Sequence, residues 1–228
     1  MKTLTVLPEQ IFGQKIEVLV DMKCYTYVVA RDFGFAPNPF GGFCTLATCK
    51  PAIRSIAKVG DWILGTGSAK MKLQGKLIFA MEVTEKLTYN DYWNDPRFQC
   101  KKPLMNCSLK KAYGDNIYFY DELNKNWLQS NSHHSNADGS INYHNLNRDT
   151  RINKVLISTC FYYFGKNCPL LPDEFNEKVC HGRSHKNITN IEDIEKIVMW
   201  IKNNFEPNYL HGMPNQFHSN IFNRYDGK

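Results

Sequence analysis

The sequence has no long hydrophobic run, and its apolar stretches fall well short of the roughly 20 residues that a membrane-spanning helix needs. The N-terminus also lacks the apolar segment of a secretory leader, because a glutamate already stands at position 9. We therefore expect a cytoplasmic protein without membrane association.

The eight cysteines include no CxxC pair, which argues against a zinc ribbon. In a cytoplasmic chain, such thiols are more typical of buried packing residues than of disulfides. The glycine-rich stretches are not followed by the Gly-Lys-Ser/Thr that a P-loop requires. No internal repeat or low-complexity segment is present. We accordingly expect no cofactor and no bound metal.

The composition is that of a globular protein, with 43% hydrophobic and 22% charged residues among 228. This length suits a single domain over residues 1–228. We divide it into a barrel-forming block at 15–103 and a block at 104–228 that completes and covers the barrel. The net charge of +6 favours a polyanionic partner, provided that the basic residues cluster on the surface.

The first block shows short strand patterns around a rigid loop. Two prolines and three glycines within Asp32–Gly42 predict irregular structure there. A short helix is predicted from Pro51, with its apolar residues on one face and its end at Gly60. Runs of β-branched and aromatic residues predict strands at Lys15–Val20, Tyr25–Ala30, Trp62–Leu64 and Lys76–Val83.

In the second block, strands are predicted at Asn116–Tyr120 and Lys154–Ser158. The polar stretch Ser130–Thr150 lies between them. It is long for a loop without elements of its own, so we expect it to be either functional or mobile.

The clearest helix signal lies near the C-terminus. Isoleucine and valine residues repeat at helical spacing over Asn190–Asn204. Thr189 and Glu192 have the spacing of a capping box. The tail after Pro207 is expected to be a loop with frayed last residues.

Several motifs resemble a known family. They are ARDFGFAPNPFGG, CTLATCKPAIR, GDWILGTGS, YWNDPRF and GDNIY, followed by a Ser/His element at Ser130–His133, VLIS before FYYFG, and a Gly-Arg-x-His element at Gly182–His185. With these motifs, most of residues 25–185 resembles the bacterial family called nucleotide modification associated domain 2. The resemblance implies an association with nucleotide modification.

The order of elements over residues 27–98 is similar to that of PUA-like barrels, particularly the EVE and ASCH modules. A strand, a loop and a short helix lead into Val-Gly-Asp-Trp, a glycine turn and a strand before the acidic, aromatic YWNDPRF segment. This similarity implies an α+β fold, in which a PUA-like mixed β-barrel carries peripheral helices.

The loop at 31–42 is the first candidate site. Proline stiffens such a loop, and glycine lets its backbone approach a ligand. Phenylalanine rings can stack on a base, an arginine can meet a phosphate, and Asp32 can accept from a base amino group or act in catalysis. The alternative is a structural corner that buries the rings. The ligand-binding residues predicted here are Arg31, Phe33, Phe35, Asn38 and Phe40.

Two later segments add candidate ligand-binding residues. Thr66 and Ser68 follow a glycine turn that could present backbone amides to an anion, or could simply bury a tryptophan. Tyr92, Trp93 and Arg97 combine rings for stacking with a cation for phosphate. Equally, the tryptophan could close the mouth of the barrel.

The second block contributes two polar elements. Ser132 and His133 lie in the polar stretch, where the histidine could act as a general base or could simply be solvated. Arg183 and His185 could form a phosphate-binding or acid–base pair.

Two further chemistries remain open. His181 and His185 are four apart and would share one face of a helix, but Gly182 and the missing acidic base argue against an HExxH-type metal site. A cysteine nucleophile such as Cys44 or Cys160 would need a lowered thiol pKa and a nearby histidine, whereas packing is the more typical role.

We therefore expect a protein that recognises a nucleotide or nucleic acid, holding a base in an aromatic pocket with arginines on the phosphate. One alternative is an enzyme that acts on a nucleotide or modified base with Asp32, His133, Arg183 and His185. Another is a protein-interaction component of a modification or defence operon. The two ligand hypotheses require the loop near Phe35 to share a cavity with Arg183 and His185.

Overall fold

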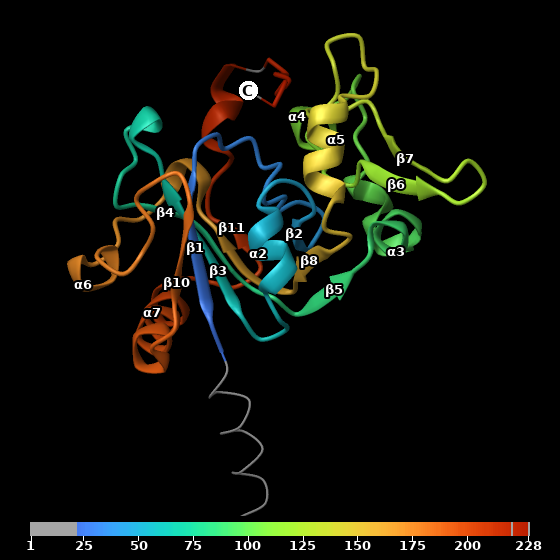
Figure 1. The fold of residues 1–228 in the computed structure, drawn as a ribbon. Helices are drawn as coiled ribbons and strands as arrows, with labels where there is room; N and C mark the ends of the chain where they lie inside the picture. Colours follow the sequence, from blue (N-terminus) through green and yellow to red (C-terminus); the bar gives the residue numbers. More distant parts are fainter. Residues whose placement is uncertain (1–21, 220, 228) are drawn as a thin grey trace, which may run out of the picture.

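The computed structural model describes residues 22–219 and 221–227, and shows a mixed α/β arrangement of bent sheets and peripheral helices (Figure 1). The strand expected at Lys15–Val20 lies outside the described residues. Among the helices that are described, none is both long enough and apolar enough to span a membrane.

The larger sheet has six strands in the order β10-β1-β3-β4-β9-β11. Strands β1 and β3 run parallel, and both β4 and β10 pair antiparallel to their neighbours. The strands are β1 (Cys24–Val29), β3 (Trp62–Gly67), β4 (Leu77–Glu82), β9 (Cys160–Tyr163), β10 (His185–Ile188) and β11 (Tyr209–Leu210).

The smaller sheet has the order β2-β8-β5, and consists of β2 (Cys44–Leu46), β5 (Glu85–Leu87) and β8 (Val155–Ser158). It continues the pairing of the larger one. Glu82 lies opposite Cys160 in one sheet and Glu85 opposite Ile157 in the other, so the register is unchanged across the break. One bent antiparallel ribbon, β4–β5 against β8–β9, therefore joins both sheets.

Of the predicted mixed β-barrel with peripheral helices, the combination of a multi-strand sheet with several helices is confirmed. Across residues 22–219 and 221–227 the paired strands form open sheets rather than a closed barrel. The PUA-like barrel therefore stays a prediction.

The remaining elements gather on two sides of the sheets (Figure 1). Helix α3 (Tyr89–Asn94), helix α5 (Tyr143–Thr150) and the hairpin of β6 (Tyr118–Asp121) and β7 (Asn126–Gln129) form one side; α6 (Asp173–Asn176) and α7 (Ile191–Asn204) lie on the other. The others are α2 (Pro51–Ile56), α4 (Leu109–Ala112), and the 3-10 helices η1 (Ala69–Met71), η2 (Pro96–Lys101), η3 (Gly165–Asn167) and η4 (Asn215–Ser219).

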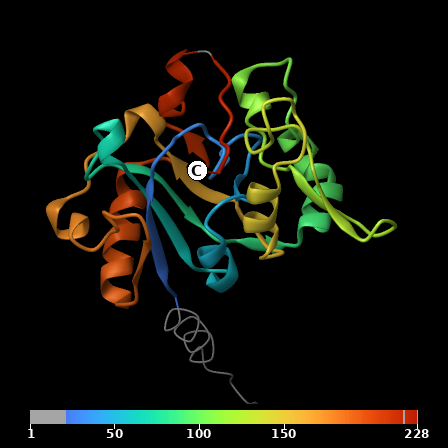
Figure 2. The same ribbon diagram turned by 45° about the horizontal axis from the view of Figure 1, so that its top comes forward.

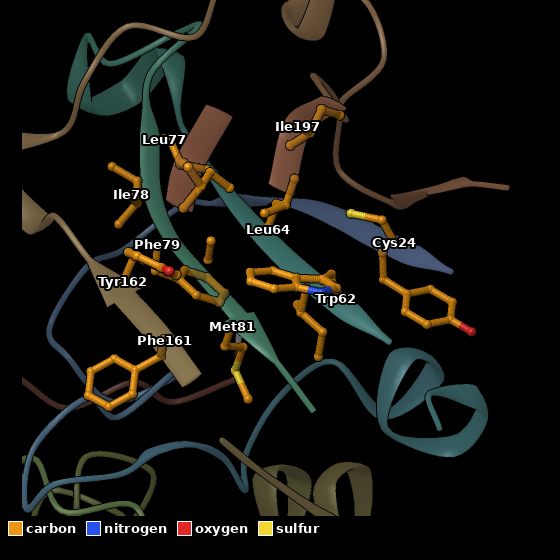
Figure 3. Close-up of a cluster of buried hydrophobic side chains, with 14 of the residues drawn as sticks. Cys24, Trp62, Leu64, Leu77, Ile78, Phe79, Met81, Phe161, Tyr162 and Ile197 are labelled. Carbon is orange, nitrogen blue, oxygen red and sulfur yellow. The ribbon is translucent and has the colours of Figure 1, made fainter. Parts of the chain in front are cut away.

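Two buried apolar clusters hold these parts together. The larger lies around the six-stranded sheet and includes residues of α7, where Figure 3 shows Ile197 directed towards Leu64 of β3. The second is rich in aromatic rings and packs the side that contains α3, α5 and β6. Phe33 and Phe35 belong to this second cluster, so the loop after β1 is anchored in it.

Most predicted elements are present, with shifted ends. Helix α2 ends at Ile56, before the predicted Gly60, because the backbone of Ala57 is extended. The cap of α7 is Asn190, whose side chain accepts from the amide of Asp193, rather than the predicted Thr189.

Three segments without a clear strand or helix pattern in the sequence take defined forms in the structure. The polar stretch at 130–150 ends in helix α5. The C-terminal tail forms β11 and is packed near its end, where the Tyr225 amide donates to the carbonyl of His133 at 2.7 Å. Figure 2 shows this red segment returning across the middle of the molecule. His181 and His185 lie in a loop and in β10, so they do not share a helix face.

Candidate functional site

A cavity of about 490 Å³ opens where the loop after β1 meets four other parts of the chain. These are the segment before α2, η1, the 133–134 turn with α5, and the C-terminal tail. The side chains that matter for chemistry are Tyr27, Arg31, Phe33, Phe35, Cys49, Lys50, Lys70, His133, His134, Arg148 and Tyr225.

The segment before α2 has an unusual backbone. Cys49 and Lys50 have φ values of 58° and 40°, in the left-handed region that residues with a side chain rarely adopt. Two buried groups hold it: the Cys49 amide donates to Asp149 Oδ1 at 3.0 Å, and its carbonyl accepts from Arg54 Nε at 2.9 Å. Such conformations persist only where the surroundings impose them, and they concentrate at functional sites.

Cys49, His134 and Asp149 form a chain of hydrogen-bonding groups. The Cys49 Sγ lies 3.7 Å from Nε2 of His134, and the opposite ring nitrogen, Nδ1, lies 3.0 Å from Asp149 Oδ2. His134 and Asp149 are buried, whereas Cys49 is partly exposed at the cavity. The arrangement orients the ring so that Nε2 faces the thiol.

The Asp149 carboxylate is satisfied by further donors. Tyr118 Oη donates to its Oδ2 at 3.0 Å, and Arg148 Nε donates to its Oδ1 at 2.9 Å. Burial opposes its ionisation, but the bonds and charges of His134 and Arg148 outweigh burial and hold the pKa of Asp149 below its usual range. The carboxylate is therefore charged behind the histidine.

The same interactions polarise the thiol and the imidazole. Burial would raise the pKa of Cys49, but the charge of His134 and its hydrogen bond outweigh it and lower that pKa. Burial would lower the pKa of His134, but the Cys49 thiolate and Asp149 outweigh it and raise that pKa. The two shifts bring the pKa values of the thiol and the imidazole closer together, which eases proton transfer from Cys49 to His134.

The three residues offer ligand atoms within 4.8 Å of one another, the spacing of a metal site. However, Asp149 bonds Nδ1 while Cys49 faces Nε2. The two side chains thus address opposite nitrogens of one ring, and an ion at the thiol would meet only two of the three. The geometry suits proton transfer better than coordination.

The cavity is cationic. Arg31, Lys50, Lys70 and Arg148 contribute to its lining, and no carboxylate is among the described residues that line it. Asp149 lies behind the wall and is already paired. Arg148 is the partner of Asp149, and the other three cations of the lining offer positive charge to an anion.

Aromatic rings form much of the wall. The Arg31 guanidinium lies 4.3 Å from the ring centre of Tyr225, and the Lys50 ammonium lies 4.3 Å from that of Tyr27. Phe33 and Phe35 are largely buried, and present only part of each ring to the cavity. Rings and cations thus contact one another in the lining of the same cavity.

A second cavity of about 540 Å³ adjoins the first and shares Arg31, Phe33, His133 and Tyr225 with it. Its other lining residues are mostly polar side chains from the 135–142 segment and the C-terminal tail. The two cavities are therefore neighbours across the Arg31–Tyr225 contact.

Four predicted site residues line the first cavity, namely Arg31, Phe33, Phe35 and His133. His133 directs Nδ1 at the carbonyl of Asn223, at 2.6 Å. Burial, followed by the charge of His134, lowers the pKa of His133 to about 3. This histidine is therefore neutral at physiological pH and is a weak base compared with His134.

Five predicted residues make internal structural bonds. Asp32 accepts from Tyr163 and Asn215, Asn38 bonds Thr45, and Tyr92 donates to Asp115. The Thr66 hydroxyl donates to the carbonyl of Cys180, and the Ser68 hydroxyl caps η1.

The other predicted residues are also placed elsewhere. Phe40 lines a different cavity, Trp93 stacks on Phe119, and Arg97 pairs with Glu85 and Asp95. Ser132 is buried beneath the second cavity.

Arg183 and His185 do not line the cavity that contains Phe35. Arg183 is exposed in the loop before β10, and His185 pairs with Tyr27 across the edge of the sheet. The juxtaposition expected from the sequence is therefore absent, and the cations of this cavity are Arg31, Lys50, Lys70 and Arg148 instead.

Sequence reasoning missed Cys49, Asp149 and Arg148, and gave His134 no separate role. It named other cysteines, because nothing local distinguishes one thiol among eight. Cys-Lys-Pro before a short helix was the available signal, but its partners lie 85 and 100 residues further along the chain.

The comparisons add the family. The family model described as nucleotide modification associated domain 2 matches residues 21–221. Comparison with curated proteins and with solved structures gave no match.

Proposed function

The chain belongs to the nucleotide modification associated domain 2 family, and from this premise we propose that its cavity binds a nucleotide or a nucleic-acid base together with its phosphate. The family description associates the domain with nucleotide modification. The ligand itself is our inference from the chemistry of the cavity.

One observation carries the proposal: aromatic rings and four cationic side chains line one cavity, and none of the described residues in its wall is a carboxylate. A nucleotide combines a flat π-surface with an anion, and this lining complements both parts. Base stacking on protein rings contributes about 1–3 kcal/mol per base, and the phosphate would be held by cations.

The sizes agree. A volume of about 490 Å³ lies within the roughly 300–1,000 Å³ range of small-molecule sites. Tyr225 is the ring most available for stacking, because it is only partly buried and Arg31 lies against it. Lys50 and Lys70 also line the cavity, where they would meet a phosphate.

A base within nucleic acid would have to leave its stack to enter this space, at a cost of a few kcal/mol. The predicted similarity to PUA-like modules supports this variant of the proposal, and the net charge of +6 would favour a nucleic-acid backbone outside the cavity. The bound species would then be a modified base.

Mass spectrometry of nucleosides and nucleotides released from the purified protein tests the proposal, together with calorimetric titration of a nucleotide panel. Arg31→Ala and Lys50→Ala should each weaken nucleotide binding about five- to fifty-fold, by loss of a charge-assisted contact. Lys196→Ala removes an exposed cation from α7 and serves as the matched control. Equal affinities for all three variants, or no binding across the panel, would reject the site.

A further inference from the structure

At the cavity lies a group of side chains, Cys49, His134 and Asp149, that ligand recognition alone does not require. A binding pocket needs rings and cations, but it does not need a thiol coupled to a buried histidine and carboxylate. Cys49 holds a strained backbone angle at the cavity wall, and its sulfur faces the ring nitrogen opposite the one that Asp149 holds. Nucleophile, base and orienting carboxylate are the three parts of a catalytic triad.

We infer that Cys49 is a nucleophile that takes an acyl group from an ester or amide on a nucleotide, with His134 as its acid–base partner and Asp149 as the positioning residue. The acyl class follows from the triad, since this arrangement serves addition to a carbonyl carbon. The nucleotide part of the substrate rests on the proposed function, whereas the thiol chemistry does not.

Two other cysteines of the chain have the surroundings typical of buried packing residues. Cys24 and Cys44 are buried in the apolar cluster around the sheet. Burial raises the pKa of the Cys44 thiol to about 12, the opposite direction to Cys49. Of these three, only Cys49 has a histidine nitrogen within hydrogen-bonding distance and a place in the cavity wall.

Side chains, rather than the nucleophile's own amide, would stabilise a developing oxyanion. The Cys49 N–H is already engaged with Asp149 Oδ1. Arg148 Nη2 lies 3.9 Å from the sulfur, and Lys50 follows the cysteine in the same wall. A cation at this position favours the negative charge that forms on the carbonyl oxygen.

The first step forms one bond and breaks one. The thiolate attacks the carbonyl carbon and makes a C–S bond, and the C–N or C–O bond to the nucleotide then breaks. The leaving amine or alcohol takes the proton that His134 Nε2 carries. An acyl thioester on Cys49 and a free nucleotide result.

The second step restores the enzyme. Neutral His134 takes a proton from water as the water oxygen attacks the thioester carbon. The C–S bond breaks, a carboxylic acid leaves and loses its proton to solvent, and the thiolate again faces the imidazolium. Both steps use only water as co-reactant, and no electrons are transferred to or from an outside group.

Alkylation by iodoacetamide, followed by peptide mass spectrometry, tests the activated thiol without any nucleotide. At pH 6, Cys49 should react about 100-fold faster than the exposed Cys107, which provides an internal reference. His134→Gln should lower the rate at Cys49 by about 100-fold and leave that at Cys107 unchanged. Asp149→Asn should move the pH profile of Cys49 alkylation upwards, a result that a merely structural carboxylate would not give.

Acylation by p-nitrophenyl acetate tests the covalent step. A burst of nitrophenol with an acetyl adduct on Cys49 is expected, and Cys49→Ser should lose both, whereas Cys107→Ser should retain them. In wild-type and Cys107→Ser protein with unchanged circular dichroism, a failure to acylate Cys49 would overturn the nucleophile. The proposal would also be overturned, in favour of a metal site, if the wild-type protein bound one zinc ion per chain and both Cys49→Ser and His134→Gln lost that zinc.

The two proposals fail separately. A nucleotide that slows alkylation of Cys49 supports both. If Cys49 is reactive but nucleotides do not slow its alkylation, the triad is supported and the nucleotide substrate is rejected. Nucleotide binding with an unreactive Cys49 rejects the triad and leaves recognition standing.

Discussion

Two buried polar clusters, built from similar groups, differ in what surrounds them. The first, the open cluster, is Cys49, His134 and Asp149 with Arg148 and Tyr118. The second, the sealed cluster, is Asp115, Tyr92, Thr45, Lys101 and Asn38. The open cluster ends in a thiol at a cavity wall, whereas no member of the sealed cluster lines either of the two adjoining cavities.

The carboxylates of the two clusters respond to burial in opposite ways. Cationic and hydrogen-bonding neighbours keep the pKa of Asp149 below its usual range. Burial dominates at Asp115 and raises its pKa to about 6, despite Lys101 and two hydroxyl donors. A perturbed pKa therefore does not by itself indicate a catalytic site, and the nucleophile and the cavity are what distinguish the open cluster.

The strongest test of this contrast is Lys101→Met. The Lys101 ammonium donates to both oxygens of Asn38 and to the Phe43 carbonyl, at 2.9–3.0 Å. Its removal leaves these buried acceptors without a donor and leaves Asp115 without a neighbouring cation. The free energy of unfolding should therefore fall by about 3–5 kcal/mol. Urea unfolding measures this change.

Its control is the neighbouring Lys102→Met, which loses only the contact of that ammonium with the Trp93 ring and should cost about 1 kcal/mol or less. Iodoacetamide reactivity of Cys49 should be unchanged in both variants that remain folded. A loss of reactivity in Lys101→Met under native conditions would contradict the separation of the clusters.

The pH dependence of stability should carry opposite signs for the two carboxylates. Between its ordinary pKa of 3.8 and its folded value of about 6, Asp115 holds a proton in the folded state that the unfolded state has lost. Its contribution is therefore complete below pH 3.8 and is lost as the pH rises to about 6, by up to about 3 kcal/mol. Asp115→Asn should remove this slope in urea titrations at pH 4–7.

Asp149 behaves in the reverse sense. Because its folded pKa is lowered, its contribution is present above the ordinary carboxyl pKa and is lost as the pH falls below it. The stability difference between wild type and Asp149→Asn should thus shrink as the pH falls below about 4. The same trend for both asparagine variants would refute the contrast.

Arg148→Met should have a smaller effect, confined to the open cluster. The guanidinium lies near the sulfur and also bonds Asp149. Its loss should slow alkylation of Cys49 by iodoacetate about ten-fold and by uncharged iodoacetamide about three-fold, because a partly exposed cation contributes about 1 kcal/mol. Arg151→Met, at the exposed end of the same helix, is the control.

The smallest expected change in stability concerns the N-terminal cap of α7. Asn190→Ala removes the cap of α7 and should cost about 1 kcal/mol in thermal or urea unfolding, whereas Thr189→Ala should cost little. Neither change should alter alkylation of Cys49. If Thr189→Ala lowered the free energy of unfolding more than Asn190→Ala, Thr189 would be the cap, as expected from the sequence.

The elements that could be predicted are those whose signal is local. The β-branched and aromatic run at 25–30, the helical repeat of α7 and the proline–glycine loop at 32–42 each follow from neighbouring residues. The same loop led to Arg31, Phe33 and Phe35, which do line the cavity. Cap positions and the helical end of the polar stretch depended on contacts with other parts of the chain.

The sequence by itself determined the family, the mixed strand and helix pattern, and a loop rich in rings. Only the tertiary structure decided the site. Cys49 is an ordinary thiol until the fold sets His134 beside it and Asp149 behind that ring, across 85 and 100 residues of chain. Chain order carries no information on such distances, whereas the pKa of a thiol depends on them directly.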